Sequence, residues 1–460
     1  MGALRCKVGP DREGQWISAW VQPLRRRVAG GLIALAAACA LAACSADPAR
    51  DAVPLRTQLA GTELRDLIDS APELAVAGER LNTGLLRRFY ARHDFGRVWT
   101  DRQAQADALV DAVLRAGDHG LDPERFHASL LRRRATFSPL RRDLLLSDAF
   151  LSYAQALASG VVPVERRRDG EALAPEPVDV AAALDAAIGS ADAAAAIEAL
   201  APATPTYRAL REALRRYRAS APAGVAAPDR LRQIEVNLER QRWLPRPLPA
   251  DRAWVNVADQ RLVLYRAGRP VFSTRVVVGE DAPRNQSPEF RASLEAGIYN
   301  PPWVIPRDIV AAEILPQIRR DPAYLARNDM VLRDNGEVEQ RPGPNAGLGV
   351  IMFDMPNRFD VYLHDTPDKQ VFARDNRRIS HGCIRVQNPV EFAALLMRQP
   401  VETIDQAIAA GGTTRNSLPT PVPIFVVYQT AFADADGTLQ FRPDFYRRDA
   451  EIWRQLQRRR

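Results

Sequence analysis

Cys383 has the neighbours that a nucleophilic thiol requires. Of the five histidines in the chain, His364 and His381 lie within twenty residues of it. A thiolate attacks carbonyl carbons and a thiol does not, so a catalytic cysteine needs a nearby base or cation, and an imidazole can serve as either. Because Gly382 lacks a side chain, a substrate carbonyl could approach the backbone N–H groups of Gly382 and Cys383, which would form an oxyanion hole. These residues predict covalent catalysis at a carbonyl, with His364 as the general base.

Alternation along two predicted strands places these groups relative to one another. In Phe359–His364, side chains alternate between a core face and an outward face, and His364 falls on the outward face. In Cys383–Val386, the same rule puts Cys383 and Arg385 together on the accessible face. A nucleophile and a guanidinium would then share one surface. The alternative for Cys383 is a buried structural cysteine.

The sequence leaves the partner of the His364 imidazole open. Asp365 is adjacent, and its backbone carbonyl could orient the ring as well as its carboxylate could. After the cysteine, Asn388 stands at a helix N-cap position, followed by Pro389 and, three residues after the cap, Glu391. This pattern predicts a helix over 389–398 that braces the site.

The elements that must position these residues differ between the two halves of the chain. In the first half, apolar residues recur every three or four positions, which predicts helices over 81–90, 104–116, 144–158, 180–200, 207–217 and 229–240. From Ala253 the pattern alternates, which predicts strands over 254–257, 262–265, 271–278, 290–299, 350–353, 359–364, 384–386 and 422–429. A helical segment over 308–319 and a Gly/Pro-rich loop over 341–349 interrupt the strands, and such an insertion could be a lid.

The N-terminal region has the features of an export signal. Three arginines, Arg25 to Arg27, precede an apolar run over 28–43 that ends in Leu-Ala-Ala before Cys44. The ending resembles the lipobox of bacterial lipoproteins, in which the cysteine carries the lipid. In Gram-negative lipoproteins, an aspartate directly after this cysteine favours retention in the inner membrane. Ser45 stands at that position here, so we expect anchoring in the outer membrane. The alternative is an ordinary signal peptide with an incidental cysteine, and residues 1–20, which lack signal character, indicate a misassigned start.

Composition narrows the class of protein further. The chain has 460 residues and four cysteines, and export would leave only Cys44 and Cys383, so no intramolecular disulfide is expected. Formal charge is +7, but residues 1–43 hold six basic and two acidic groups, so a chain that begins at Cys44 keeps 57 basic and 54 acidic groups, or +3. A net charge this small does not indicate a nucleic-acid-binding protein. No spacing suggests a metal site or a phosphate-binding loop, and we expect neither metal nor cofactor.

The residues around the cysteine resemble the signature of the YkuD-type L,D-transpeptidases. In this signature a histidine is followed, after a defined gap, by Ser/Thr-His-Gly-Cys, as His364 is followed after fifteen residues by Ser380-His381-Gly382-Cys383. Six further segments are similar to the large YcbB-like branch of this family. Three lie in the predicted catalytic domain, Tyr299 to Pro306, Met355 to Asn357 and Tyr362 to Pro367, and three lie before it, Asn237 to Pro245, Phe89 to Trp99 and Gly120 to Pro123. The similarity covers roughly residues 60–430.

The resemblance implies roles for individual residues. Cys383 is the nucleophile, His364 the general base and acid, Gly382 an oxyanion donor through its backbone, and His381 a supporting residue. Substrate contacts are expected from Arg385, Trp303, Tyr362 and Ser380. In many members of the family, the residue two positions after the cysteine is an asparagine. This chain has Arg385 there, as the YcbB-like members have an arginine. Many relatives carry a small peptidoglycan-binding module that we do not expect in this chain, because only the linker Ala219 to Pro228 occupies its place.

The function implied by this resemblance is peptidoglycan cross-linking. Cys383 would attack the carbonyl between diaminopimelate and the terminal D-alanine of a tetrapeptide stem, D-alanine would leave, and an amine of another stem would resolve the thioester. Two alternatives stay open. The same thioester could be resolved by water or by an anchored lipoprotein, or the chain could be a wall-binding lipoprotein without activity. The expected partners are peptidoglycan stems and, through the Cys44 lipid, a membrane, with no nucleic acid.

The predicted fold is therefore multidomain α+β, in which a helical N-terminal scaffold domain precedes a mainly β YkuD-type catalytic domain with an inserted lid. We expect these divisions of the chain: a signal segment over 1–43, a linker over 44–59, a helical scaffold domain over 60–220, a linker and helix over 221–250, a catalytic domain over 251–430 with its lid at about 303–349, and a C-terminal extension over 431–460. The expected location is the periplasm, at the outer membrane.

Overall fold

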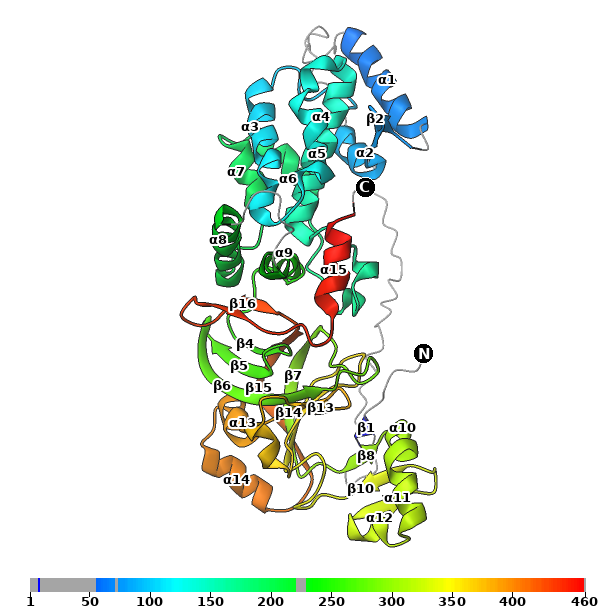
Figure 1. Ribbon diagram of the computed structural model, residues 1–460, viewed down its shortest axis with the longest axis vertical. Helices are drawn as coiled ribbons and strands as arrows, with labels where there is room; N and C mark the ends of the chain where they lie inside the picture. Colours follow the sequence, from blue (N-terminus) through cyan, green and yellow to red (C-terminus); the bar gives the residue numbers. More distant parts are fainter. Residues whose placement is uncertain (1–6, 9–54, 71–72, 221–228, 459–460) are drawn as a thin grey trace, which may run out of the picture.

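The computed structural model describes residues 7–8, 55–70, 73–220 and 229–458 (Figure 1). The molecule is elongated, with a helical region at one end, a β-sheet region in the middle and a small insertion at the other end. The predicted fold class is confirmed, because a helical N-terminal part precedes a mainly β part. The predicted signal segment, apart from residues 7–8, and Cys44 lie outside the described residues.

The helical region is built around one long helix that is buried on almost every side. This helix, α5 (Pro139–Ser159), has buried side chains over most of its length, from Asp143 to Ala158. The helices around it are α1 (Leu55–Ser70), α2 (Thr83–Ala91), α3 (Gln103–Leu114), α4 (Ala128–Arg132), α6 (Val180–Ile188), α7 (Ala193–Glu198) and α8 (Pro205–Ser220), with a short hairpin of β2 (Ala75–Val76) and β3 (Glu79–Arg80). Helices α1 to α7 share one apolar core with this hairpin, whereas the buried side chains of α8 pack in a separate cluster with those of the helix over 229–242.

Two boundaries in this region differ from the prediction. The alanine-rich stretch predicted as one helix over 180–200 is two helices, because Gly189 ends α6 and the Asp192 carboxylate caps α7 by accepting the Ala195 N–H at 2.9 Å. Helix α1 begins at Leu55, inside the segment predicted as a linker.

The middle region is a nine-stranded sheet that closes on itself. Its order is β13-β6-β14-β12-β11-β7-β15-β4-β5, and β5 also pairs with β6. The strands are β4 (Arg252–Asn256), β5 (Arg261–Arg266), β6 (Arg269–Gly279), β7 (Phe290–Tyr299), β11 (Ile351–Asp354), β12 (Leu363–His364), β13 (Arg378–Ser380), β14 (Ile384–Val386) and β15 (Thr414–Val427). Their inward side chains form a second core, which includes Phe392 of helix α13 (Pro389–Met397). Helix α14 (Val401–Ala409) follows α13.

The strand predicted over 359–364 is much shorter in the structure, where only Leu363–His364 pairs with neighbouring strands. The side chain of Asn357 accepts the N–H groups of Phe359 at 3.0 Å and Val361 at 3.3 Å, which would otherwise bond to a strand. Asp360 also has a positive φ of 52°. This turn, typical of asparagine, replaces the first half of the expected strand.

The insertion between β8 (Trp303–Ile305) and β11 has its own small core. Strand β10 (Val338–Gln340) pairs with β8, and β9 (Met330–Leu332) pairs with β10. The insertion also contains helices α10 (Arg307–Ile309), α11 (Leu315–Arg320) and α12 (Tyr324–Arg327), with a π-helical turn at Val310–Ile314. Ile305, Ile309, Ile314 and Val338 are its buried side chains. Strand β1 (Lys7–Val8), from the predicted signal segment, pairs with β8.

Helix α9 (Asp229–Arg242) lies between the helical region and the sheet, and the C-terminal segment packs against it (Figure 1). That segment comprises β16 (Ala431–Ala433), β17 (Leu439–Phe441) and α15 (Arg448–Leu456). It is more than an exposed extension, because Tyr446, Arg448 and Leu456 are buried.

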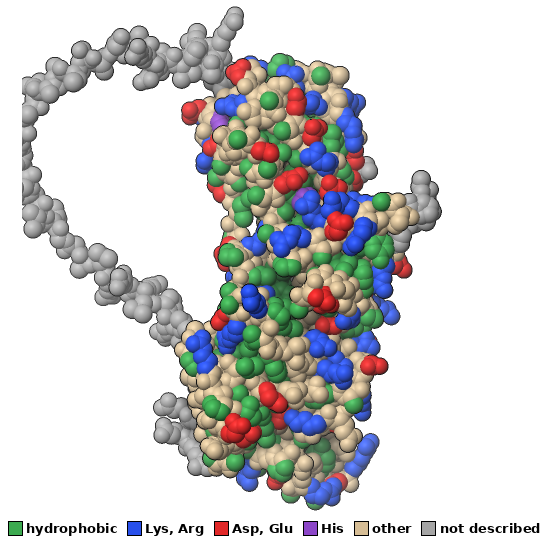
Figure 2. Space-filling model, turned by 90° about the vertical axis from the view of Figure 1, so that its left-hand side faces the viewer, with side chains coloured by type: hydrophobic (Ala, Val, Ile, Leu, Met, Phe, Trp, Pro, Cys, Tyr) green, Lys and Arg blue, Asp and Glu red, His purple; other side chains and the backbone are tan. Residues whose placement is uncertain are grey.

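On the face of the molecule shown in Figure 2, basic and acidic side chains are interspersed. None of the helices in the described ranges is both long enough and apolar enough to span a membrane.

Candidate active site

Parallel pairing of β12 with β14 brings the predicted catalytic residues together. His364 is the register partner of Arg385, and Leu363 is the partner of Ile384. Cys383 stands two positions before Arg385, so it belongs to the same face of the sheet as His364 and lies diagonally from it. As alternation predicts, Ile384 is fully buried, whereas Cys383 and Arg385 are partly exposed. The sulfur, imidazole and guanidinium thus share one face.

His364 is buried and does not face outward to solvent as predicted. Only 5% of it is exposed. Strand β12 lies inside the sheet, between β11 and β14, and the Tyr362 ring contacts the imidazole edge-on with 5.7 Å between ring centres. Alternation identified the face correctly, but it carries no information about which loops cover that face.

The backbone carbonyl of Asp365, not its carboxylate, orients the imidazole. His364 Nδ1 lies 2.5 Å from this carbonyl oxygen and donates to it, which leaves Nε2 as the nitrogen that can accept a proton in the neutral ring. The Asp365 carboxylate accepts the Val350 N–H at 3.1 Å and pairs with Lys369. Gly349 must be glycine here, because its φ is 64° and a Cβ would lie 2.4 Å from an Asp365 carboxylate oxygen.

Burial and a neighbouring charge keep His364 uncharged. Burial, followed by the Arg385 guanidinium, lowers the pKa of His364 to about 3, although the carbonyls of Asp365 and Leu348 favour the protonated ring. At neutral pH the imidazole is therefore a neutral base.

Arg385 presents its charge to the cysteine. Burial lowers the pKa of Arg385, and the charges of Cys383, Asp368 and Glu313 oppose that shift. Its Nε is buried and has no hydrogen-bond partner among the described residues. A buried donor of this kind, on the face that carries the sulfur, is available to an anionic or carbonyl group of a ligand.

The turn that carries Cys383 is held by its own hydrogen bonds. The Ser380 hydroxyl donates to the Cys383 carbonyl at 2.6 Å and accepts the Gly382 N–H at 3.2 Å. These hydrogen bonds bear on the roles predicted for Ser380 and Gly382. Ser380, predicted to bind substrate, is buried and bonded within the turn. The Gly382 N–H, predicted as an oxyanion donor, is already bonded to Ser380. Gly382 has a φ of 119°, which favours glycine.

His381 contacts the insertion. Its Nε2 lies 2.8 Å from Oε1 of Glu313, in the π-helical turn of the insertion. This contact fits the supporting role predicted for His381. Sequence reasoning missed Glu313, because an acid in a predicted surface helix carries no signal that it approaches a residue 68 positions away.

The two predicted aromatic contacts differ in accessibility. Tyr362 is 6% exposed and packs on His364. Trp303 is partly exposed and packs against both the sheet core and the core of the insertion. Its indole Nε1 is buried and has no hydrogen-bond partner within the described ranges. Trp303 therefore lies where the insertion joins the sheet, and Tyr362 contributes mainly packing.

The other histidines lie in the helical region, as the sequence suggests. His119 Nδ1 is 2.8 Å from the Tyr207 hydroxyl, His127 Nε2 is 2.9 Å from Asp148, and His93 Nε2 is 3.2 Å from Asp185. In the described part of the chain, no three His, Cys, Asp or Glu side chains are grouped so that they could hold a metal ion.

Comparison with known families and proteins agrees with this geometry. Residues 84–214 match a scaffold-domain family and residues 250–424 match YkuD, the L,D-transpeptidase catalytic domain. A Haemophilus influenzae protein, provisionally named an L,D-transpeptidase, is 27% identical over 399 residues, which are 80% of this chain and 78% of that protein.

Solved structures show weaker likeness. An L,D-transpeptidase from Mycobacterium smegmatis is 14% identical over 38% of this chain, with a TM-score of 0.22, and the match spans little more than half of that chain, 58%. The catalytic domain of the Enterococcus faecium L,D-transpeptidase acylated by ertapenem is 13% identical over 39% of this chain and 98% of that domain, with a TM-score of 0.22.

Proposed function

Because this chain is a YkuD-type L,D-transpeptidase with a scaffold domain ahead of its catalytic domain, we propose that it cross-links peptidoglycan stem peptides through a thioester on Cys383. We place it in the YcbB-like branch on the motifs described above. The observation that carries the proposal is the pairing of β12 with β14, which gives Cys383, His364 and Arg385 a common face.

In the first step, Cys383 is acylated. The thiol proton passes to neutral His364, and the sulfur attacks the carbonyl between diaminopimelate and the terminal D-alanine. Protonated His364 then gives the proton to the departing amine, so D-alanine leaves and a thioester remains. The Arg385 charge favours the thiolate and disfavours the imidazolium.

In the second step, an amine of another stem attacks the thioester. A C–N bond forms, the C–S bond breaks and Cys383 recovers its proton. The free energy for the new amide comes from the peptide bond broken in the first step. The oxyanion role proposed for Gly382 requires its N–H to exchange the Ser380 hydroxyl for the substrate oxygen.

The test uses the full chain and the Cys383→Ala variant. Mass spectrometry of muropeptides treated with each protein distinguishes cross-linked, trimmed and unchanged stems by mass. A carbapenem, the β-lactam class that acylates this family, should add one adduct to the wild type and none to the variant. Undiminished turnover by Cys383→Ala would show that the nucleophile lies elsewhere.

We also propose that the protein is a lipoprotein, anchored in the outer membrane through Cys44. The support is the lipobox-like ending of the apolar segment before Cys44, followed by Ser45. Globomycin should cause an unprocessed precursor to accumulate, and Cys44→Ser should release or mislocalise the protein. A native protein that fractionates as a free periplasmic species with another N-terminus would contradict the proposal.

A further inference from the structure

A carboxylate from the insertion stands beside the catalytic turn. Glu313 pairs with His381 at 2.8 Å, two residues before the nucleophile, and its side chain is 53% exposed. Its charge also acts on Arg385, together with those of Cys383 and Asp368. Because the insertion has its own core, this carboxylate reaches the site from a part of the molecule that the catalytic sheet does not contain.

We propose that Glu313 selects the acceptor that resolves the thioester, an inference that rests on the proposed function. The acceptor of a cross-linking reaction is a cationic ammonium group before it reacts, whereas the acceptor of hydrolysis is neutral water. A half-exposed carboxylate that contacts the turn carrying the nucleophile can hold an ammonium through a charge-assisted hydrogen bond. It binds neutral water less strongly. Glu313 therefore raises the local concentration of the amine relative to water.

The resolving step balances without any further reactant. The bound ammonium first loses one proton to solvent, and the resulting amine nitrogen forms a bond to the thioester carbonyl carbon. The C–S bond breaks, and the second nitrogen proton ends on the Cys383 sulfur. Glu313 neither gives nor takes a proton in this step, so its role is to bind the acceptor. The acylation step, in which no ammonium acceptor takes part, does not depend on it.

The experiment measures how the thioester partitions between two products. Wild type and Glu313→Gln are given a disaccharide tetrapeptide, and the ratio of cross-linked dimer to tripeptide is followed by mass spectrometry. We expect this ratio to fall about tenfold, the loss typical of one charge-assisted hydrogen bond. The rate of carbapenem acylation should change less than about twofold. The control is Glu337→Gln, which changes a partly exposed acid of the same insertion that contacts Asn335.

Other outcomes have distinct meanings. An unchanged product ratio in Glu313→Gln, or an equal fall in Glu337→Gln, would overturn the role of Glu313. A parallel loss of acylation would show that Glu313 merely holds the turn through His381. If the wild type releases D-alanine but forms only tripeptide, the cross-linking function itself fails, and this result does not depend on the variant.

A second and independent observation concerns the other side of the catalytic turn. The hydroxyl of Ser287, which is fully buried, donates to the Gly382 carbonyl at 2.7 Å and accepts the Gly279 N–H at 2.9 Å. The Tyr446 hydroxyl accepts the Ser287 N–H at 3.3 Å and donates to the Gly279 carbonyl. Arg448 donates to the Ser287 carbonyl at 2.9 Å.

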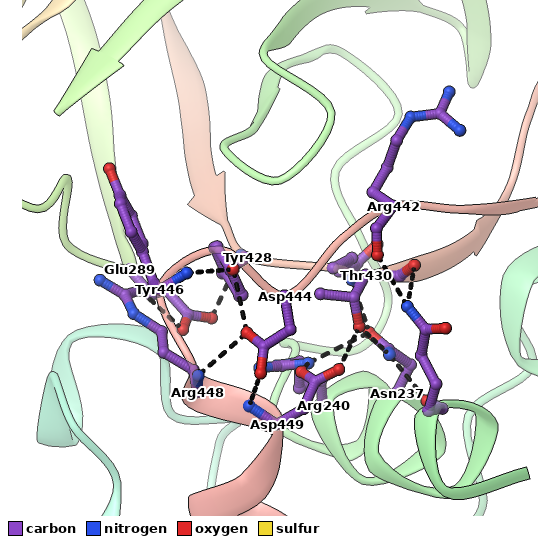
Figure 3. A network of polar contacts seen from close by, with 12 residues as sticks. Asn237, Arg240, Glu289, Tyr428, Thr430, Arg442, Asp444, Tyr446, Arg448 and Asp449 are labelled. Carbon is purple, nitrogen blue, oxygen red and sulfur yellow. Dashed lines mark hydrogen bonds and ion pairs between the residues drawn. The ribbon is translucent and has the colours of Figure 1, made fainter. Parts of the chain in front are cut away.

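Tyr446 and Arg448 lie beyond residue 424, where the match to the catalytic family ends. They belong to the network drawn in Figure 3, which continues to helix α9. In this network Tyr428 donates to Asp444 at 3.0 Å, Asp449 pairs with Arg240 at 2.5 Å, and Thr430 bonds to Asn237 at 2.7 Å. A continuous polar chain thus joins the interdomain helix to the turn that holds the nucleophile.

The geometry points to Ser287 and Tyr446 as positioning residues, through which the C-terminal segment fixes the Cys383 turn. Ser287→Ala and Tyr446→Phe each remove one hydroxyl and leave the thiol, imidazole and guanidinium in place. We expect the first-order acylation rate by a carbapenem to fall about tenfold, because positioning errors reduce rate more than binding. The apparent affinity for the carbapenem should change little.

The matched control is Tyr153→Phe, because this scaffold hydroxyl is buried and has no hydrogen-bond partner among the described residues. Rates are normalised to titrated free thiol, so that unfolded protein does not count. Wild-type rates in Ser287→Ala, or an equal fall in Tyr153→Phe, would refute the positioning role. If the variants bound the carbapenem more weakly but kept the wild-type first-order acylation rate, the positioning role would also be refuted.

Discussion

The helical scaffold and the catalytic sheet each contain a buried histidine beside an arginine. His119 is 1% exposed, and burial, with Arg211 and Arg242, lowers its pKa to about 2. His364 is 5% exposed, and burial, with Arg385, lowers its pKa to about 3. The two rings therefore have the same charge at neutral pH for the same reasons.

What differs between the two histidines is the neighbour. His119 contacts the Tyr207 hydroxyl at 2.8 Å, so its hydrogen bond is made within the core of the protein. His364 shares a sheet face with Cys383, which is partly exposed. A strongly lowered pKa is a common property of active-site groups, but buried structural groups share it. The nucleophile on the same face is what distinguishes the catalytic histidine.

The largest effect should come from His364→Ala. Loss of general-base help should reduce the rate of carbapenem acylation about 10²–10⁴-fold at neutral pH, with partial recovery at higher pH as hydroxide produces more thiolate. His381→Ala should lower the rate without this alkaline rescue, since His381 belongs to the tight turn that carries Cys383 and its loss should disturb the geometry of that turn. The measurement is loss of free thiol against pH. If the rescue appears only in His381→Ala, the two roles are reversed.

His119→Phe should have the opposite profile. The buried Tyr207 hydroxyl accepts from Arg242 at 3.2 Å, so the substitution removes the acceptor for its own proton, and the free energy of unfolding should fall by about 1–3 kcal/mol. The acylation rate per folded molecule should not change. Denaturant unfolding gives the first quantity and thiol titration with carbapenem the second. A loss of acylation rate in fully folded His119→Phe would break the comparison between the two histidines.

The same variant sharpens the comparison through pH. The folded pKa of His119, about 2, lies below the value of about 6.5 for an unfolded histidine. The unfolded chain therefore binds a proton below pH 6.5 that the folded chain does not, and stability present above this pH is lost as pH falls. The wild type should lose about 1.4 kcal/mol per pH unit more than His119→Phe below pH 6. Parallel stability curves would contradict this account.

The smallest effect is expected from Asp365→Asn. Because the backbone carbonyl orients His364, the substitution leaves that bond in place and keeps an oxygen that can accept the Val350 N–H. Acylation should fall less than about tenfold, well short of the loss of a general base, and show no alkaline rescue. A loss as large as that of His364→Ala would mean that the carboxylate acts on the imidazole after all.

Local patterns in the sequence specified much of the architecture. Apolar spacing predicted α2, α3, α5, α8 and α9 but not α1 or α4, and alternation predicted most strands of the sheet. It could do so because side chains that face a core recur with the period of the element. The predicted element boundaries were wrong where a side-chain oxygen accepts a backbone N–H that a regular strand or helix would bond to another backbone carbonyl. Asn357 satisfies two N–H groups and shortens the expected strand over 359–364, and Asp192 starts a new helix inside a continuous alanine-rich run.

For the candidate site, the sequence by itself determined the reactive groups and the face they share. The spacing from His364 to Cys383 and the alternation around Arg385 suffice for that, since both follow from local geometry. Only the tertiary structure decided that His364 is buried, that Ser380 bonds within the turn, that Glu313 reaches His381, and that Ser287 and Tyr446 hold the turn from behind. These contacts join residues up to 159 positions apart. Local periodicity determines which way a side chain points, but what it meets there depends on how distant segments pack.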